Sequence, residues 1–317
     1  MDCEASTISS NEFIECYNSS SIILTEGSVG LRTINEFGLK CDGQIMHASH
    51  IYSSRGRKAL KKIYGQYLQV AQVFSVPILL MTNTRRANRD RVLNSPYKDK
   101  NIMSDYANFL REVTENYKCE TYIGGYIGCK GNGYTGDDCL SQEEAAYFHA
   151  WQIEESNRAN IDFIFASLMP TLDETIGLAK AMEKSIFPYT ISFMIHENGT
   201  IPDGHTIDEA IHVVDKSTVS QPMCYMTNCI HPGILRNALR CNNTPLVRAR
   251  FKGIQANAAY LSPEELDKSS ETISSSAYDL ANEIIYLNNE FPLKIYGGCC
   301  GTDASHLREF ALRLCTG

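Results

Sequence analysis

Long hydrophobic runs are missing from this sequence of 317 residues. A membrane-spanning helix needs about 20 consecutive apolar residues, and the longest candidate, Val73–Met81, contains Pro77 and is better interpreted as a buried strand. The N-terminal residues Met1–Thr7 are acidic and polar, and they lack the basic start and apolar stretch of a signal peptide. We therefore expect a cytoplasmic protein with no membrane partner.

A concentrated basic patch, the usual footprint of a nucleic-acid-binding protein, is also missing. The chain has 29 Lys and Arg residues against 37 Asp and Glu residues, which gives a formal net charge of −8. The basic stretches Arg55–Lys62 and Arg85–Arg91 are short and interrupted, and we interpret each as the solvated face of a helix or loop. We expect no nucleic-acid partner.

The twelve cysteines are too sparse in a chain of this length for a small disulfide scaffold. Without a signal peptide, most of them should be reduced thiols. Most free cysteines are inert and buried, so the informative question is which of the twelve are not.

Short apolar runs alternate with longer amphipathic stretches throughout the chain. Each run is apolar on both faces, which is typical of the strands of a parallel sheet covered by helices. The eight candidate strands are Ile22–Thr25, Ile78–Asn83, Tyr122–Ile127, Phe163–Ser167, Thr190–Met194, Met223–Asn228, Phe251–Ala256 and Lys294–Gly298.

Four predicted helix starts carry a capping box, in which a hydroxyl and a carboxylate three residues later satisfy each other's backbone amides. These boxes are Ser141–Glu144, Thr171–Glu174, Thr206–Glu209 and Ser262–Glu265. No linker rich in proline or serine divides the chain. We predict an N-terminal extension over residues 1–20 and one β/α domain over residues 21–317.

Eight βα units favour a closed barrel over an open, doubly wound sheet. The length is sufficient, because a β/α barrel needs about 250 residues. The Gly27–Gly30 stretch after the first strand does not match the Gly-x-Gly-x-x-Gly pattern of a dinucleotide site. The predicted fold is α/β, a (β/α)8 TIM-type barrel.

The sharpest motif is Gly297-Gly-Cys-Cys-Gly-Thr302, directly after the eighth predicted strand. A second, Thr227-Asn-Cys229, follows the sixth strand. Both strands of a barrel end on its carboxyl-terminal face, where active sites of this fold lie. We therefore predict that the thiols of Cys229, Cys299 and Cys300 converge there.

Three sulfur ligands without a fourth indicate a catalytic zinc site with one open position. A substrate thiol that takes this position loses its proton and becomes a nucleophile. We predict Zn2+ as the cofactor and assign the three cysteines a catalytic role through it. His231 is interpreted as a loop histidine and His306 as a residue that orders its turn.

At these residues the chain resembles the homocysteine S-methyltransferase family. The Gly-Gly-Cys-Cys-Gly-Thr run followed by His306 looks like the family's C-terminal signature, and Thr227-Asn-Cys229 is similar to its first zinc-ligand motif. Further similarity lies at Glu26–Gly30, Thr82–Thr84, Gly124–Gly128, Tyr134–Gly136, Leu140–Ser141 and Asn257.

The resemblance implies a zinc-dependent barrel enzyme that moves a methyl group from a small donor to the zinc-bound thiolate of homocysteine, giving methionine. Because the chain ends soon after the eighth strand, we expect no cobalamin domain, and a sulfonium or a betaine would suit as donor. The implied substrate contacts are Glu26, Gly27, Thr82, Asn83, Ser167 and Asn228.

Two positions depart from the family pattern. Glu26 replaces an aspartate, and Ser167 replaces a glutamate that is expected to hold the substrate amine. Loss of that charge-assisted contact costs about 1.5–3 kcal/mol. Two alternatives stay open: the same zinc chemistry on another thiol acceptor, and a non-catalytic zinc-binding barrel. Pairing of barrels through their outer helices is also possible.

Overall fold

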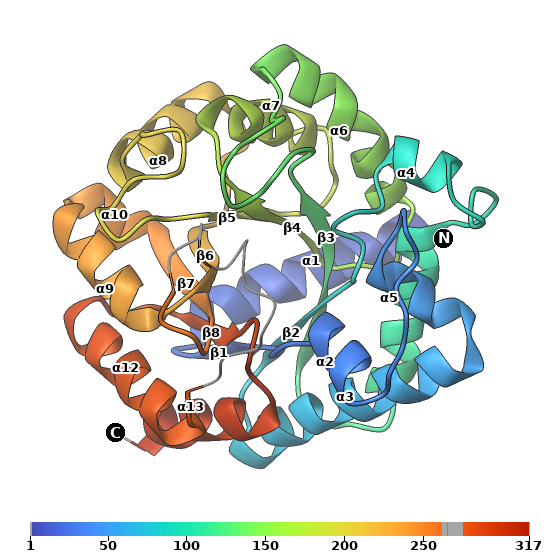
Figure 1. Ribbon diagram of the computed structural model, residues 1–317, viewed down its shortest axis with the longest axis horizontal. Coiled ribbons are helices and arrows are strands. Elements are labelled where there is room, and N and C mark those ends of the chain that lie inside the picture. The colour runs from blue at the N-terminus through green and yellow to red at the C-terminus, as the bar shows by residue number, and fades with distance from the viewer. Residues whose placement is uncertain (1, 262–264, 266–274, 317) are drawn as a thin grey trace.

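The computed structural model describes residues 2–261, 265 and 275–316, and side chains from residue 10 onward within those ranges. Its centre is a closed barrel of parallel strands, each hydrogen-bonded to the next in sequence, with β8 paired to β1 (Figure 1). The strands are β1 Ile23–Thr25, β2 Ile78–Met81, β3 Thr121–Gly128, β4 Phe163–Met169, β5 Tyr189–Phe193, β6 Tyr225–Ile230, β7 Phe251–Ala256 and β8 Ile295–Gly298.

Helices surround the barrel in Figure 1 and connect its successive strands. They are α2 Gly30–Asn35, η1 His47–Tyr52, α3 Ser54–Phe74, α4 Arg89–Leu93, α5 Ile102–Thr114, α6 Gln142–Asn157, α7 Leu172–Met182, α8 Ile207–Ser217, α9 Pro232–Cys241, α10 Pro245–Arg250, α12 Ala277–Glu290 and α13 Ala304–Thr316. The predicted (β/α)8 barrel is confirmed. None of the helices within the described residues combines the length and the hydrophobicity that a membrane-spanning segment requires.

All eight predicted strands form, with ends that differ from the prediction by at most two residues. The largest extensions are at β4 and β6, which continue to Met169 and Ile230. Both carry a register shift near their carboxyl end, between Ala166 and Met169 in β4 and between Asn228 and Ile230 in β6. A bulge of this kind adds a residue to one strand and redirects side chains.

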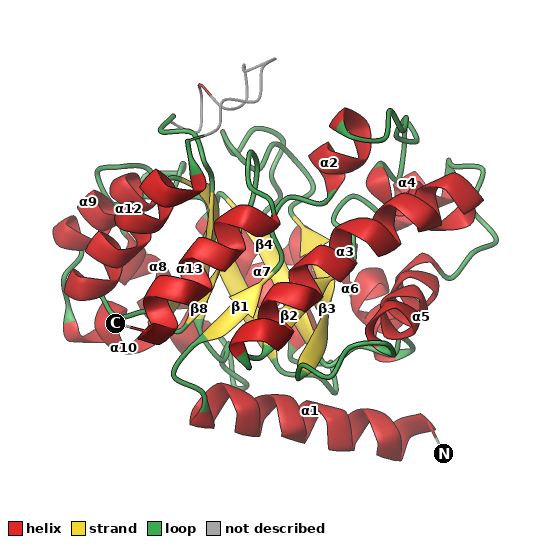
Figure 2. Ribbon diagram, turned by 90° about the horizontal axis from the view of Figure 1, so that it is seen from below, coloured by secondary structure: helices red, strands yellow, loops and turns green. Residues whose placement is uncertain are grey.

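The N-terminal segment forms helix α1, Asp2–Ser19, which lies across the lower end of the barrel in Figure 2. Phe13 is fully buried, and its ring stacks on Phe163 with ring centroids 4.5 Å apart. Cys16 joins the same cluster of barrel-interior side chains. Helix α1 therefore closes the amino-terminal end of the barrel, and the carboxyl-terminal rim stays available for a site.

Two of the predicted capping boxes form, at Ser141 and Thr206. The predicted box at Thr171 is wrong, because Glu174 turns away from it. The Glu174 carboxylate accepts hydrogen bonds from the backbone amides of Lys130 (2.6 Å) and Leu140 (3.1 Å), so it fixes the loop after β3 instead. The box Ser262–Glu265 lies outside the described residues.

Candidate metal centre and substrate cavity

The structure brings the three predicted cysteines together at the carboxyl-terminal rim. Cys229 lies near the end of β6, and Cys299 and Cys300 directly follow β8. Their sulfur atoms all lie within 4.8 Å of one another, and those of Cys299 and Cys300 are 4.0 Å apart. Cys229 and Cys299 are in contact as a disulfide, with Cα atoms 5.4 Å apart. Segments 70 residues apart thus supply one group of sulfurs.

The glycines of the second motif allow this loop to pack closely. A Cβ atom on Gly298 would lie 2.1 Å from the hydroxyl oxygen of Thr302, and Gly301 adopts a positive φ of 77°. Only glycine accepts both constraints at low cost. The Thr302 hydroxyl donates to the carbonyl of Cys299 at 2.7 Å, which closes the turn.

The cysteine pair is also fixed to the end of β7. The Cys299 amide donates to the carbonyl of Ala256 at 2.7 Å, and the amide of Ala258 donates to the carbonyl of Cys300 at 3.1 Å. Both sulfurs are therefore carried by a backbone that is hydrogen-bonded to the end of β7 at each cysteine.

Cys229 itself has a left-handed backbone with φ of 59°, and so does Leu168 at the end of β4, with φ of 53°. Such a conformation costs a residue other than glycine of order 1–3 kcal/mol. The Asn228 side chain stabilises both bulges, because its Oδ1 accepts from the Leu168 amide (3.2 Å) and the Ser192 hydroxyl (2.6 Å). Strained backbone at both strand ends is thus held in place beside the sulfurs.

A cavity of about 330 Å³ opens beside the three cysteines; we call it the main cavity. Its other walls are residues Glu26–Leu31, Met46, His47, Asn83, Arg85, Arg86, Tyr126, Tyr134, Leu168, Gln255 and Gly298. Of the predicted substrate contacts, Glu26, Gly27 and Asn83 lie on this wall. Thr82, Ser167 and Asn228 are fully buried and absent from it, because their side chains are used in contacts between strand ends.

The Glu26 carboxylate lies at the end of β1 and is buried. Both of its oxygens face the backbone amide of Met81, at 3.1 and 3.0 Å. Burial raises the pKa of Glu26 to about 8, although the backbone hydrogen bonds lower it in part. Burial therefore favours the protonated form of this carboxyl group at neutral pH.

The position of the second expected carboxylate is uncharged. The Ser167 hydroxyl lies 2.9 Å from the Tyr126 hydroxyl and 3.3 Å from Asn228 Oδ1. Tyr126 lines the main cavity, and burial raises the pKa of its phenol. A neutral serine–tyrosine pair thus occupies this side of the cavity.

The interpretation of Arg85–Arg91 as a solvated face is wrong for Arg85 and Arg86, which line the main cavity. Sequence reasoning missed them because a short basic run has the same composition whether it faces solvent or a cavity. Burial raises the pKa of the Cys300 thiol, and the positive charge of Arg85 lowers it in part. Arginine thus contributes to the electrostatics of the sulfur group.

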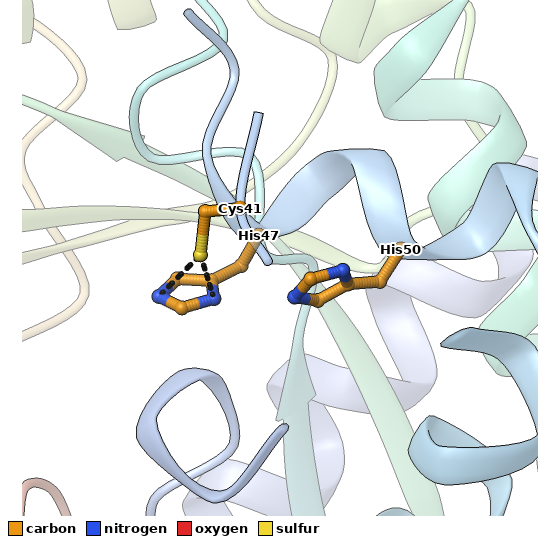
Figure 3. Close-up of side chains that lie close together, drawn as sticks. All are labelled: Cys41, His47 and His50. Carbon is orange, nitrogen blue, oxygen red and sulfur yellow. Dashed lines mark hydrogen bonds between the residues drawn. The ribbon is translucent and has the colours of Figure 1, made fainter. Parts of the chain in front are cut away.

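A second group of metal-ligand type was also missed: Cys41, His47 and His50, with ligand atoms within 4.8 Å of one another (Figure 3). Of these three residues, His47 lines the main cavity. The Cys41 sulfur lies 3.1 Å from His47 Nδ1. Burial lowers the pKa of His47 to about 4 and raises the pKa of Cys41, so a neutral thiol–imidazole hydrogen bond accounts for this contact. The spacing Cys-x5-His-x2-His is the only sequence signal for it.

The remaining candidate side chains have local structural contacts. His231 caps α9 by accepting from the Gly233 amide at 3.1 Å, and burial lowers its pKa to about 4. The ring nitrogens of His306 lie 2.9 Å from an oxygen of Asp303 and 3.1 Å from the Ser275 carbonyl, an arrangement that orders the start of α13. Neither histidine belongs to a metal-ligand group of the described residues.

A closed β/α barrel with three cysteines and a cavity at its carboxyl-terminal rim has the architecture of a barrel enzyme. The family model described as homocysteine S-methyltransferase matches residues 24–314, so the chain belongs to the homocysteine S-methyltransferase family. The protein is a methyltransferase.

Relatives agree with this assignment. The chain is 23% identical to homocysteine S-methyltransferase 2 of Saccharomyces cerevisiae over 290 residues, which cover 82% of this chain and 81% of the relative. Its fold is similar to crystal structures of the homocysteine methyltransferase MmuM from Escherichia coli. The metallated form has a TM-score of 0.74 at 16% identity, with 93% of this chain and 97% of that one covered. The oxidized form has a TM-score of 0.72 at 17% identity, with 94% and 97% covered.

Proposed function

We propose that this protein transfers a methyl group from a small sulfonium or betaine-type donor to the thiol of homocysteine, giving methionine, with Zn2+ held by Cys229, Cys299 and Cys300. One observation carries the proposal: three sulfurs from two loops meet at the wall of the main cavity. Membership of the family and the names of its relatives support homocysteine as the acceptor.

The chemistry of the donor set fits zinc. Thiolates favour zinc among the abundant divalent ions, and three of them leave one position of a tetrahedron for a substrate. Two sulfurs bound at about 2.3 Å to one zinc lie roughly 3.8 Å apart, close to the 4.0 Å between Cys299 and Cys300. The Cys229–Cys299 contact requires reduction first, because the ligands are thiolates.

When bound, zinc lowers the pKa of a substrate thiol, so that the nucleophilic thiolate exists at neutral pH. The protein positions the rest of the acceptor. Glu26 faces the main cavity, and a substrate ammonium beside it would stabilise the carboxylate and release its proton. Leu168, Tyr126 and Tyr134 supply apolar and aromatic surface to the wall beside the cysteines.

The test is methionine formation by the reduced, zinc-loaded protein with homocysteine and a panel of sulfonium and betaine donors. Cys300→Ala should abolish turnover, because one of three metal ligands is lost. Cys241→Ala is the matched control, since Cys241 is an exposed free thiol. No methionine from any donor at full zinc occupancy would overturn homocysteine as the acceptor, and no methylated product from any thiol tested would leave a non-catalytic zinc-binding barrel.

A second candidate is transfer to a thiol that lacks an amine, and the neutral Ser167–Tyr126 pair favours it. The two candidates separate when homocysteine is compared with its des-amino analogue. If homocysteine is the acceptor, the analogue should have the lower kcat/KM in the wild type, and Glu26→Gln should remove the difference. If the wild type prefers the analogue and Ser167→Glu reverses that preference, the acceptor pocket has diverged from the family pattern and the acceptor is a thiol without an amine.

A further inference from the structure

A second hollow of about 560 Å³ adjoins the main cavity and shares Arg85, Arg86 and Tyr134 with it. We call it the basic hollow, because four cationic side chains line it against one acidic side chain, Asp138. The four cations are Arg85, Arg86, Arg91 and Lys130. This concentration of positive charge is local, since the whole chain has a formal net charge of −8.

Backbone carbonyls, not carboxylates, hold Arg86 and Arg91 in place. Arg86 Nη1 donates to the carbonyls of Lys130 (3.3 Å) and Gly131 (3.1 Å), and Arg91 Nη1 donates to the carbonyl of Gln44 (2.8 Å). Elsewhere arginines do pair with acids, as Arg250 does with Asp215 at 2.9 Å. Within the described ranges, none of the four cations of the basic hollow forms a salt bridge. The guanidinium groups of Arg86 and Arg91 are thus held by carbonyl oxygens without a carboxylate partner among the described residues.

The local fold orients the arginine side chains toward the basic hollow. Arg85 and Arg86 lie in the loop between β2 and α4, and Arg91 lies on α4, whose first turn is capped by Asn88 Oδ1 accepting from the Arg91 amide at 3.1 Å. The Arg85 stem lies against Gly128, where a Cβ atom would come within 2.4 Å of Arg85 Cγ. Because Gly128 in β3 has no side chain, Arg85 can extend to the junction of the two cavities.

We propose that the basic hollow binds an anionic tail, with two or more carboxylate or phosphate groups, on the methyl donor, while the methyl-bearing end of that donor reaches the cysteines through the main cavity. This rests on the proposed function. Guanidinium groups bind carboxylate and phosphate oxygens in pairs. Four cations suit more than one negative charge, and a donor with only a cationic group would be repelled from the basic hollow.

Anion binding is measured first, without turnover. The reduced, zinc-free full chain is titrated calorimetrically with inorganic pyrophosphate and with propane-1,2,3-tricarboxylate, which separates phosphate from carboxylate recognition. Arg86→Gln and Arg91→Gln should each weaken binding about tenfold, because each removes charge-assisted hydrogen bonds. Arg86→Lys should restore part of it. Arg89→Gln is the matched control, because Arg89 is exposed on the same helix and absent from the basic hollow.

Two donors with the same sulfonium centre then test the link to catalysis, one with a dicarboxylate tail and one with the corresponding neutral diamide. The wild type should show a KM about tenfold lower for the dicarboxylate, and Arg91→Gln should reduce this ratio toward one. Equal anion affinity in all variants, or no binding at low ionic strength, would overturn the basic hollow as a site. Anion binding that follows the variants, with no tail preference in KM, would overturn its role for the donor. If no donor reacts at all, the proposed function fails, and the titrations alone decide whether the basic hollow binds anions.

Discussion

Replacing Glu26 by glutamine should change how the stability of the protein depends on pH. The folded-state pKa of Glu26 is about 8, against a usual value of 4.5, because the carboxyl group is buried. The folded protein therefore binds this proton more tightly than the unfolded chain does. The resulting stabilisation is fully present below the usual pKa and is lost as the pH rises through about 8. Wild-type protein should thus lose stability across the neutral range.

The size of the effect follows from the shift. Each unit of pH between the two pKa values costs about 1.4 kcal/mol, so the loss from roughly pH 5.5 to 7.5 is about 3 kcal/mol. In Glu26→Gln the side chain stays neutral, and its oxygen can still accept from the Met81 amide, which lies 3.0–3.1 Å from the native carboxylate. The free energy of unfolding of the variant should therefore not fall in this way over the same pH range.

Urea unfolding at several pH values measures the effect, on reduced and zinc-free samples so that metal binding does not contribute protons. His47 and His231, whose pKa values burial lowers, titrate in both proteins and cancel in the difference. The free energy of unfolding of the wild type minus that of the variant should fall by about 3 kcal/mol over the window given above. A constant difference would show that Glu26 is ionised in the folded protein and would refute the reasoning.

Three further predictions concern the metal and the barrel. Cys300→Ser should lose its zinc in a competition with a chromophoric chelator that leaves the Cys241→Ser control loaded. Zinc uptake should require reductant, because the Cys229–Cys299 disulfide removes two ligands; equal uptake by oxidised protein would contradict the assigned site. Phe13→Ala should lower the free energy of unfolding by about 3–5 kcal/mol in urea, with kcat unchanged because Phe13 lies at the opposite end of the barrel. The exposed neighbour Ile14→Ala should change stability by less than about 1 kcal/mol.

The barrel and the convergence of the cysteines can both be predicted from the pattern of amino acids along the chain. Eight apolar runs separated by helical stretches define βα units, and β7 begins and ends at the predicted residues. Because parallel strands of a barrel all end on one face, a cysteine after β6 and two after β8 can be placed together without coordinates. Strand periodicity and connection order are local properties, so they can be read from the chain.

The surroundings of each polar group near the site, by contrast, could not be predicted from the sequence. Glu174 fits a capping box by spacing, yet it holds the loop after β3, where it accepts hydrogen bonds from two backbone amides and lies 3.1 Å from His149 Nε2. From the sequence, the run Arg85–Arg91 is interpreted as a solvated face. Arg85, Arg86 and Arg91 nevertheless line cavities, because the loops after β2 and β3 meet. Burial raises the pKa of Glu26, and this burial depends on the fold and not on the residues next to Glu26 in the sequence. Burial, charge and hydrogen-bond competition depend on segments distant in the chain, and only the folded barrel brings those segments together.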